Sequence, residues 1–317
     1  MSRRSFVLLA AAALVPFASA RLSGQAIPRT ADGRPDFAGI WTNSTLTPFE
    51  RPKEFTGKEF FTPKEAADYG RRMQEQNNRD RRGATPQDDV NLAYNEAWFD
   101  RGTKVYSNLR TSIVVDPADG RVPALTPEAR DAAAARAAVQ SRRPEGPEDF
   151  PVAVRCLLLA NAGPPMVSTG YNNNYAIVQT RDSVGIDVEM IHDMRIIPLS
   201  GRPHISISIR LWMGDSVGHW DGDTLVVDTT NFTDKTHFRG SDQNLRLIER
   251  FRLMNANTIH YRFTVDDPTA FLKPWTGEII MSRAPGPLYE YACHEGNYSL
   301  ADMLRGARAE EKTPQKP

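Results

Sequence analysis

The stretch from residue 187 to residue 298 constrains the fold more than any other, because short apolar segments alternate there with turn sequences. An Asp-Gly pair at 221–222, the commonest signal for a tight hairpin, precedes the β-branched run 225–230. Nearby runs rich in Ile and Val have strand length, and they occupy 176–180, 183–190 and 195–199. The pattern predicts consecutive antiparallel strands.

Two more hairpins follow at similar spacing. Residues 245–254 and 259–265 flank one turn, and residues 278–283 and 288–293 flank the next. A meander of roughly eight strands tends to close on itself, because closure removes exposed edges. We therefore expect a mainly β fold, with an antiparallel domain over 151–300 that forms a lipocalin-like barrel or a sandwich.

Side-chain alternation indicates which residues face the interior. In 259–265 the odd positions are apolar and the even positions are polar or charged, as a half-buried strand requires. Asp187 and Glu189 alternate with apolar residues in the same way. We expect them on a solvated face, with the lining of a polar cavity as the alternative, since unpaired carboxylates are seldom buried.

The beginning of the chain has the pattern of an export signal. Residues 1–20 combine a basic start, an apolar run and a small-residue cleavage site, which is typical of a secretory signal peptide. The Arg3-Arg4 pair also resembles a twin-arginine signal, so both export routes stay open. No later run approaches the roughly 18 apolar residues that a membrane span needs. We expect a periplasmic or secreted protein.

An N-terminal extension over 21–150 contains two helix starts. Thr62 and Thr126 each precede a proline, which places an N-cap residue before a favoured first helical residue. We expect helices over 66–76 and 129–142. A proline-rich linker at 141–151 then leads into the β domain, and residues 301–317 form a C-terminal tail.

Charge and cysteine content limit the partners and the compartment. Without its first 20 residues the chain has 37 basic and 39 acidic residues, a net charge of −2. This balance does not favour nucleic acid or an anionic membrane as a partner. A small-molecule ligand or substrate is the partner class that remains, and the sequence sets no oligomeric state.

Cys156 and Cys293 are the only cysteines, and an even number in an exported chain favours a disulfide. On the chain-entropy model this bridge would contribute on the order of 4 kcal/mol and would tie the segment entering the barrel to its last strand. The alternative is a catalytic thiol at Cys293 beside His294. Adjacent residues on a strand point to opposite faces, so the disulfide is favoured.

The sequence contains little that matches the familiar catalytic or metal-binding motifs. Gly214-Asp215-Ser216 is similar to the nucleophile block of one class of secreted lipases, but it lies among β hairpins instead of after the first strand of an α/β fold. His219, Asp221 and Asp223 would present metal ligands if their strand continued, yet the Asp-Gly turn is the favoured interpretation. We therefore expect no metal and no cofactor.

A group of ionisable residues at predicted strand ends could move protons. Histidine titrates near neutral pH, and a neighbouring carboxylate can orient it or complement it. At the mouth of a barrel such residues would line a pocket. The candidate catalytic residues are Glu189, His192, Asp193, His294 and Glu295.

Three long stretches carry a resemblance to known sequences, at 187–199, 214–232 and 289–298. They resemble signature stretches of a large group of uncharacterised exported bacterial proteins. That resemblance implies export and a shared architecture, and it implies no catalytic residue. In addition, Gly39-Ile40-Trp41 resembles the entry to the first strand of lipocalin-like barrels, in which the Trp closes one barrel end.

These observations support two main hypotheses about function. The first is a β-barrel that binds a small apolar or aromatic molecule in its interior, and the second is a cofactor-independent lyase, isomerase or hydrolase with a His/carboxylate pair at the barrel mouth. A purely structural role is a third. The candidate ligand-binding residues are Trp220, Tyr261, Phe263, Trp275 and Tyr291.

Overall fold

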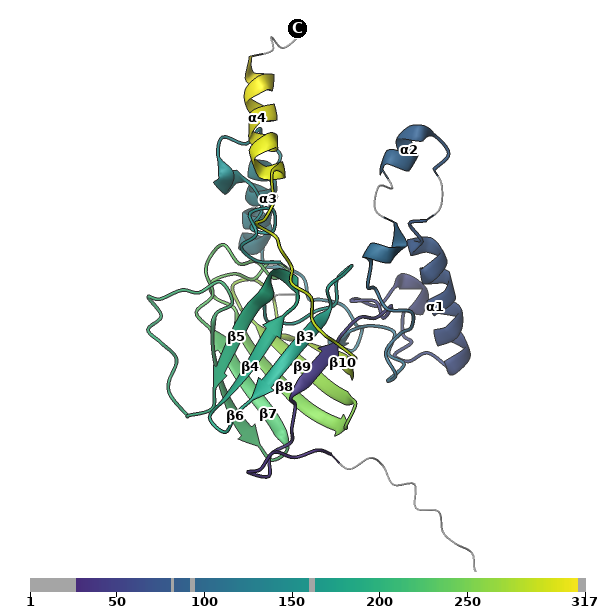
Figure 1. Cartoon of the computed structure of the whole chain (residues 1–317), viewed down its shortest axis with the longest axis vertical. Coiled ribbons are helices and arrows are strands. Elements are labelled where there is room, and N and C mark those ends of the chain that lie inside the picture. The colour runs from purple at the N-terminus through teal and green to yellow at the C-terminus, as the bar shows by residue number, and fades with distance from the viewer. Residues whose placement is uncertain (1–26, 81–82, 92–94, 160–162, 313–317) are drawn as a thin grey trace, which may run out of the picture.

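A computed structural model describes residues 27–80, 83–91, 95–159 and 163–312. The predicted signal peptide lies outside the described residues. Ten strands form one antiparallel sheet that curls into a nearly closed barrel (Figure 1). The prediction of a mainly β, barrel-like fold is confirmed.

The strands follow the order β5-β4-β3-β1-β10-β9-β8-β7-β6, and β2 pairs with β10 outside this path. Their bounds are β1 Gly39–Thr42, β2 Val114–Asp116, β3 Asn174–Gln179, β4 Ser183–Val188, β5 Asp193–Pro198, β6 Asp215–Asp221, β7 Thr224–Thr230, β8 Arg246–Asn255, β9 Thr258–Asp266 and β10 Trp275–Arg283. β1 comes from the N-terminal extension, yet it lies between β3 and β10. The extension thus joins the two halves of the meander.

The predicted strand at 288–293 is wrong. The chain is irregular there, because β10 already pairs with β9 on one side and with β1 and β2 on the other, which leaves no edge for another strand. Pro285 and Pro287 also lack the N–H that a ladder needs.

Both predicted helix starts are confirmed. Thr62 caps α1 in a capping box with Glu65, and the Thr126 side chain accepts a hydrogen bond from the Ala129 N–H at the start of α3. A further helix, α4, occupies most of the predicted tail. The helices are α1 Pro63–Asn77, α2 Pro86–Asn91, α3 Pro127–Gln140 and α4 Ser299–Glu311, and short 3₁₀ turns cover Lys53–Phe55, Glu96–Trp98, Pro147–Asp149 and Met190–His192. Across the described ranges, no helix combines the length and apolar character needed to cross a membrane.

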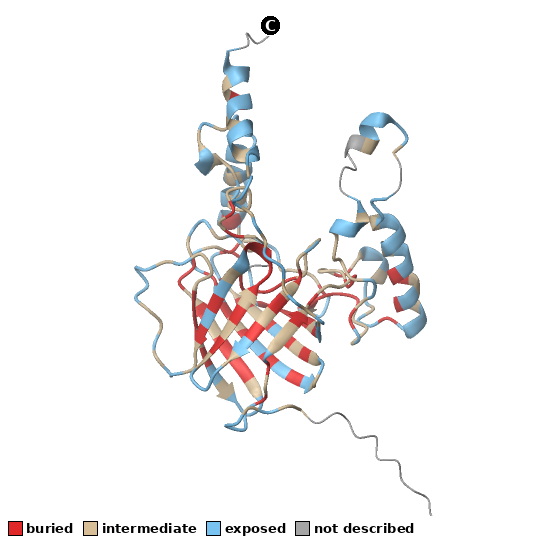
Figure 2. Cartoon of the chain, viewed as in Figure 1, coloured by how far each residue is buried: buried red, intermediate tan, exposed pale blue. Residues whose placement is uncertain are grey.

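The core fills the barrel with the alternating side chains that the sequence predicted. All odd positions of 259–265 are fully buried, and Figure 2 shows the same alternation along neighbouring strands. Trp41 is also fully buried, its indole N–H donates to the Phe37 carbonyl at 2.8 Å, and the Arg283 guanidinium lies 4.4 Å from its ring. This side chain is part of the barrel core.

α1 belongs to a lobe beside the barrel with a small core of its own. Phe61 and Tyr69 stack at 5.3 Å, and Phe55 packs edge-on against Phe61 at 4.9 Å. Figure 1 shows this lobe on the side of the barrel nearest β10, whereas α3 and α4 stand together at one end.

The disulfide prediction is confirmed, with a bond between Cys156 and Cys293. Its expected role is corrected, because Cys293 lies after β10 and not on the last strand. The bridge fastens the C-terminal segment to the linker region. α4 adds to this attachment, since Arg308 donates to the carbonyl oxygens of Pro144 and Glu145 at 2.6 and 3.0 Å.

Candidate functional site

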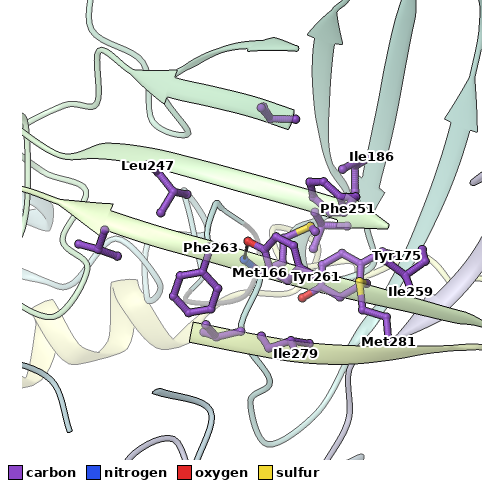
Figure 3. Close-up of a cluster of buried hydrophobic side chains, with 14 of the residues drawn as sticks. Met166, Tyr175, Ile186, Leu247, Phe251, Ile259, Tyr261, Phe263, Ile279 and Met281 are labelled. Carbon is purple, nitrogen blue, oxygen red and sulfur yellow. Dashed lines mark hydrogen bonds between the residues drawn. The ribbon is translucent and has the colours of Figure 1, made fainter. Parts of the chain in front are cut away.

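The aromatic residues predicted to line a ligand cavity form a packed core instead. Tyr261, Phe263 and Trp275 have no exposed surface. The ring centre of Phe263 lies 5.7 Å from that of Tyr261 and 5.8 Å from that of Trp275. Figure 3 shows Tyr261 and Phe263 among aliphatic neighbours such as Ile279 and Met281. Their bulk fills the interior, so these three are structural.

Trp220 lies at the opposite end of the barrel from the β4–β5 turn. It stacks on Phe37 at 5.9 Å, and the Arg34 guanidinium lies 5.6 Å from its ring. Phe37 just precedes the end of β1 that pairs with Ile177, whereas the β4–β5 turn adjoins the Asn174 end of β3. Trp220 therefore seals one barrel end.

A buried polar network also occupies the barrel. The Arg195 guanidinium is 4% exposed and forms a two-point ion pair with the Glu249 carboxylate, which is fully buried. It also donates to the hydroxyls of Ser216 and Thr229, each at 2.9 Å. These contacts link β5 to β6, β7 and β8 across the side of the barrel where β5 and β6 form no ladder within the described residues.

The Tyr261 hydroxyl completes this network. It donates to Glu249 at 2.8 Å and accepts from the Met166 backbone N–H at 3.1 Å. Burial, and then the neighbouring Glu249 carboxylate, raise the pKa of Tyr261 well above its usual value. The phenol stays neutral, and Glu249 gains a third donor that makes its burial tolerable.

Residues of the stretch 214–232 make structural contacts, and Ser216 is not placed as a catalytic nucleophile. Residues 214–218 read Gly-x-Ser-x-Gly, but Ser216 is buried on β6, where its hydroxyl accepts from Arg195. That is not the strand-to-helix turn such a nucleophile requires. Asp215 accepts two hydrogen bonds from Arg202 and one from the Ile205 N–H, and so it fixes the loop that precedes β6.

The Asp-Gly segment forms the predicted hairpin turn between β6 and β7. Gly222 has a φ of 58°, Asp221 pairs with Arg250 at 2.6 Å, and Asp223 pairs with Arg29. His219 is exposed. Within the described residues, no group of three His, Cys, Asp or Glu side chains is arranged to hold a metal ion.

Three of the five predicted catalytic residues, Glu189, His192 and Asp193, lie in or beside the β4–β5 turn. Glu189 is 7% exposed and accepts a hydrogen bond from Asn174 at 2.8 Å, so its predicted solvated position is wrong. Burial, together with repulsion from Asp187, raises the pKa of Asp193 despite the nearby His192. Ile191 and His192 have φ values of 64° and 48°, a left-handed backbone that is strained for β-branched Ile191.

The C-terminal segment contacts this turn through one of the predicted ligand residues. The Tyr291 carbonyl lies 3.1 Å from His192 Nδ1. His294 and Glu295 are exposed in the turn after the disulfide. The structure therefore places Tyr291 beside His192, and it leaves His294 and Glu295 at the surface.

A cleft of about 730 Å³ separates α1 from the barrel, and the sequence did not indicate it. Ala66 and Gly70 of α1 form one wall, the loop 102–109 forms another, and Ile280 of β10 lies at the barrel side. The complete lining is Thr42, Ser44, Pro63, Ala66, Ala67, Gly70, Arg71, Gln74, Gly102, Thr103, Lys104, Val105, Tyr106, Ser107, Leu109, Ile280 and Ser282.

Backbone hydrogen bonds hold the walls of the cleft in place. The Leu46 N–H donates to the Lys104 carbonyl at 2.9 Å, and the Tyr106 N–H donates to the Thr47 hydroxyl at 2.8 Å. On the helix side, the Gln74 amide donates to the Thr103 carbonyl at 2.8 Å. The loop 102–109 is thus fastened both to α1 and to the segment that follows β1.

Comparison with known proteins assigns this chain to no family. No protein family model matches this chain, and no curated protein matches it significantly. The functional argument therefore depends on the geometry of the chain itself.

Proposed function

We propose that this chain is an exported protein that binds a small molecule, and that the ligand occupies the cleft between α1 and the barrel. The observation that carries this proposal is the cleft itself, at about 730 Å³. Ligand pockets commonly have volumes of roughly 300–1,000 Å³ and often lie where two packed units meet. The disulfide supports the predicted oxidising compartment outside the cytoplasm.

The lining favours a ligand with an apolar body and an anionic or polar end. Val105, Leu109 and Ile280 offer apolar surface. Lys104 is exposed at the cleft and forms no ion pair among the described residues, so its ammonium is available to a carboxylate or sulfonate. The sequence led us to expect a small apolar or aromatic ligand in the barrel interior; this proposal adds an anionic or polar end to the ligand and moves the site to the cleft.

The test blocks the cleft without touching the core. Ala67 is exposed on α1 and lines the cleft, whereas Glu75 is exposed on the same helix outside it. With an anilinonaphthalene sulfonate dye as probe, Ala67→Trp is expected to weaken binding about tenfold or more, and Glu75→Trp to leave it unchanged. Equal dye affinity in both variants would reject the cleft as the site, and native mass spectrometry of the purified protein would then locate any bound molecule elsewhere.

The β4–β5 turn favours the enzymatic alternative as a second candidate. One carboxylate oxygen of Asp193 is buried and lacks a hydrogen-bond partner among the described residues, and its raised pKa suits a general acid or base beside His192. We expect any turnover of ester, lactone or enolisable ketone substrates to be lost in Asp193→Asn and kept in His294→Gln. Turnover that survives Asp193→Asn would remove this candidate.

A further inference from the structure

The outer face of β8 and β9 carries an unusual arrangement of positive charge. Arg250 of β8 lies directly opposite Arg262 of β9, and Arg252 lies directly opposite His260. All four side chains line a hollow of about 570 Å³ on this face, together with Thr224, Ile248 and Thr264. We call this hollow the arginine groove. None of its described lining residues is acidic.

Like charges directly opposite one another on antiparallel strands are destabilising. The nearby carboxylates offset this repulsion only in part. Arg250 pairs with Asp221 at 2.6 Å, but both side chains are about half exposed, and such pairs contribute little. Glu278 lies 3.8 Å from Arg262, and it is shared with Arg110 at 3.0 Å and with His260 at 3.7 Å.

Arg252 is the least compensated of the groove residues. It forms no close ion pair with any described residue, and its charge acts on Asp223 only at longer range, because two hydrogen bonds from Arg29 engage that carboxylate. The groove therefore holds more positive charge than the adjacent acids neutralise. A bound anion would supply the missing negative charge.

We propose that the arginine groove binds a small molecule that carries two or more oxyanion groups. The Arg250/Arg262 pair and the Arg252/His260 pair stand two residues apart along the strands, which is about 7 Å. Each pair presents donors to one oxyanion group, and Arg is well suited to two-point contacts with phosphate and carboxylate oxygens. The Thr224 and Thr264 hydroxyls add neutral hydrogen-bonding groups at the rim.

This site goes beyond the proposed function, because the groove and the cleft share no lining residue. They are neighbours on the sheet, since His260 of the groove lies directly opposite Ile280 of the cleft. An anion in the groove would lie beside the cleft without entering it. The two proposals can therefore fail separately.

The experiment measures binding of inorganic pyrophosphate and of citrate by calorimetry at low ionic strength. Arg252→Gln removes the uncompensated charge, and Arg246→Gln is its matched control, because Arg246 is on the same face of β8 but outside the groove and pairs with Asp228 at 2.7 Å. We expect Arg252→Gln to weaken binding about tenfold and Arg246→Gln to change it less than about twofold. A preference for pyrophosphate or for citrate distinguishes a phosphorylated ligand from a polycarboxylate.

Thermal melts separate loss of binding from loss of fold. Arg252→Gln removes one positive charge from a face that also carries Arg250 and Arg262, so its melting temperature is expected to equal or exceed that of the wild type. Ala67→Trp, which blocks the cleft, is expected to bind both anions normally. The proposal is overturned if neither anion binds the wild type, or if Arg246→Gln weakens binding as much as Arg252→Gln.

Discussion

At the scale of single residues, Arg195 brings a charge into the middle of an apolar barrel. Glu249, Ser216 and Thr229 surround its guanidinium, so the charge is paired and its donors are used. Removing one member of such a pair leaves the other charge buried and unpaired. We expect Arg195→Met to lower the free energy of unfolding by about 3–5 kcal/mol, measured by urea denaturation.

A surface ion pair on the same barrel provides the control for this prediction. Arg246→Met breaks an exposed contact with Asp228, and we expect it to lose no more than about 1 kcal/mol. The double variant Arg195→Met/Glu249→Leu should regain much of the stability that Arg195→Met loses. If Arg195→Met is as stable as Arg246→Met, the interior network does not support the fold.

The environment of Glu278 predicts how the folding stability of the protein changes at acidic pH. The polar contact with His260 at 3.7 Å, followed by the charges of Arg110, His260 and Arg262, lowers the pKa of Glu278 although burial opposes this. A carboxylate whose folded pKa is lowered stabilises above its unfolded pKa of about 4.3, and that stability is lost as the pH falls through the folded pKa.

The expected result is a difference between two pH profiles. Between about pH 6 and pH 3, the wild type should lose more stability than Glu278→Gln, because the variant has no carboxylate to protonate. Melting temperatures across this range measure the effect, and the exposed Glu75→Gln is the control. Parallel profiles for the wild type and Glu278→Gln would contradict the assigned role of this carboxylate.

At the scale of elements, the sequence predicted the parts whose pattern is local. The alternation in 259–265 and the cap at Thr62 are both present in the structure. The segment 288–293 has the composition of a strand, but the preceding strand β10 has no free edge for it to join, and that depends on the rest of the sheet. The buried position of Glu189 likewise depends on its contact with Asn174 of β3.

The cleft could not be predicted for a related reason. Its walls come from α1, from the loop 102–109 and from β10, and each segment is ordinary by itself. The packed positions of Tyr261, Phe263 and Trp275 could not be predicted, because apolar alternation does not distinguish a filled barrel from a hollow one. The disulfide was predictable, since it required only two cysteines and an exported chain.

The disulfide gives an element-scale prediction. It closes a loop of 137 residues, and on the chain-entropy model it stabilises by about 4–5 kcal/mol. The double variant Cys156→Ala/Cys293→Ala should lose stability on that order in urea denaturation. α4 should become the first site of proteolysis, since it would then be held to the linker by exposed contacts such as those of Arg308 with Pro144 and Glu145 and of Glu310 with Arg143. Unchanged stability and unchanged cleavage would contradict this role.

At the scale of the whole molecule, two packed units meet at one cleft. An aromatic core and a hydrogen-bonded polar network fill the interior of the barrel. The α1 lobe has a separate core of Phe55, Phe61 and Tyr69. Binding is therefore expected between the units and not within the barrel. The arginine groove lies next to this junction, on the outer face of the same sheet.

The most direct measurement is a crystal structure of the protein with its co-purified ligand, or with the sulfonate dye soaked in. The account predicts ligand density between Ala67 of α1 and Ile280 of β10, with an anionic group near Lys104. Density inside the barrel, with Tyr261 and Phe263 moved apart to admit the ligand, would contradict it.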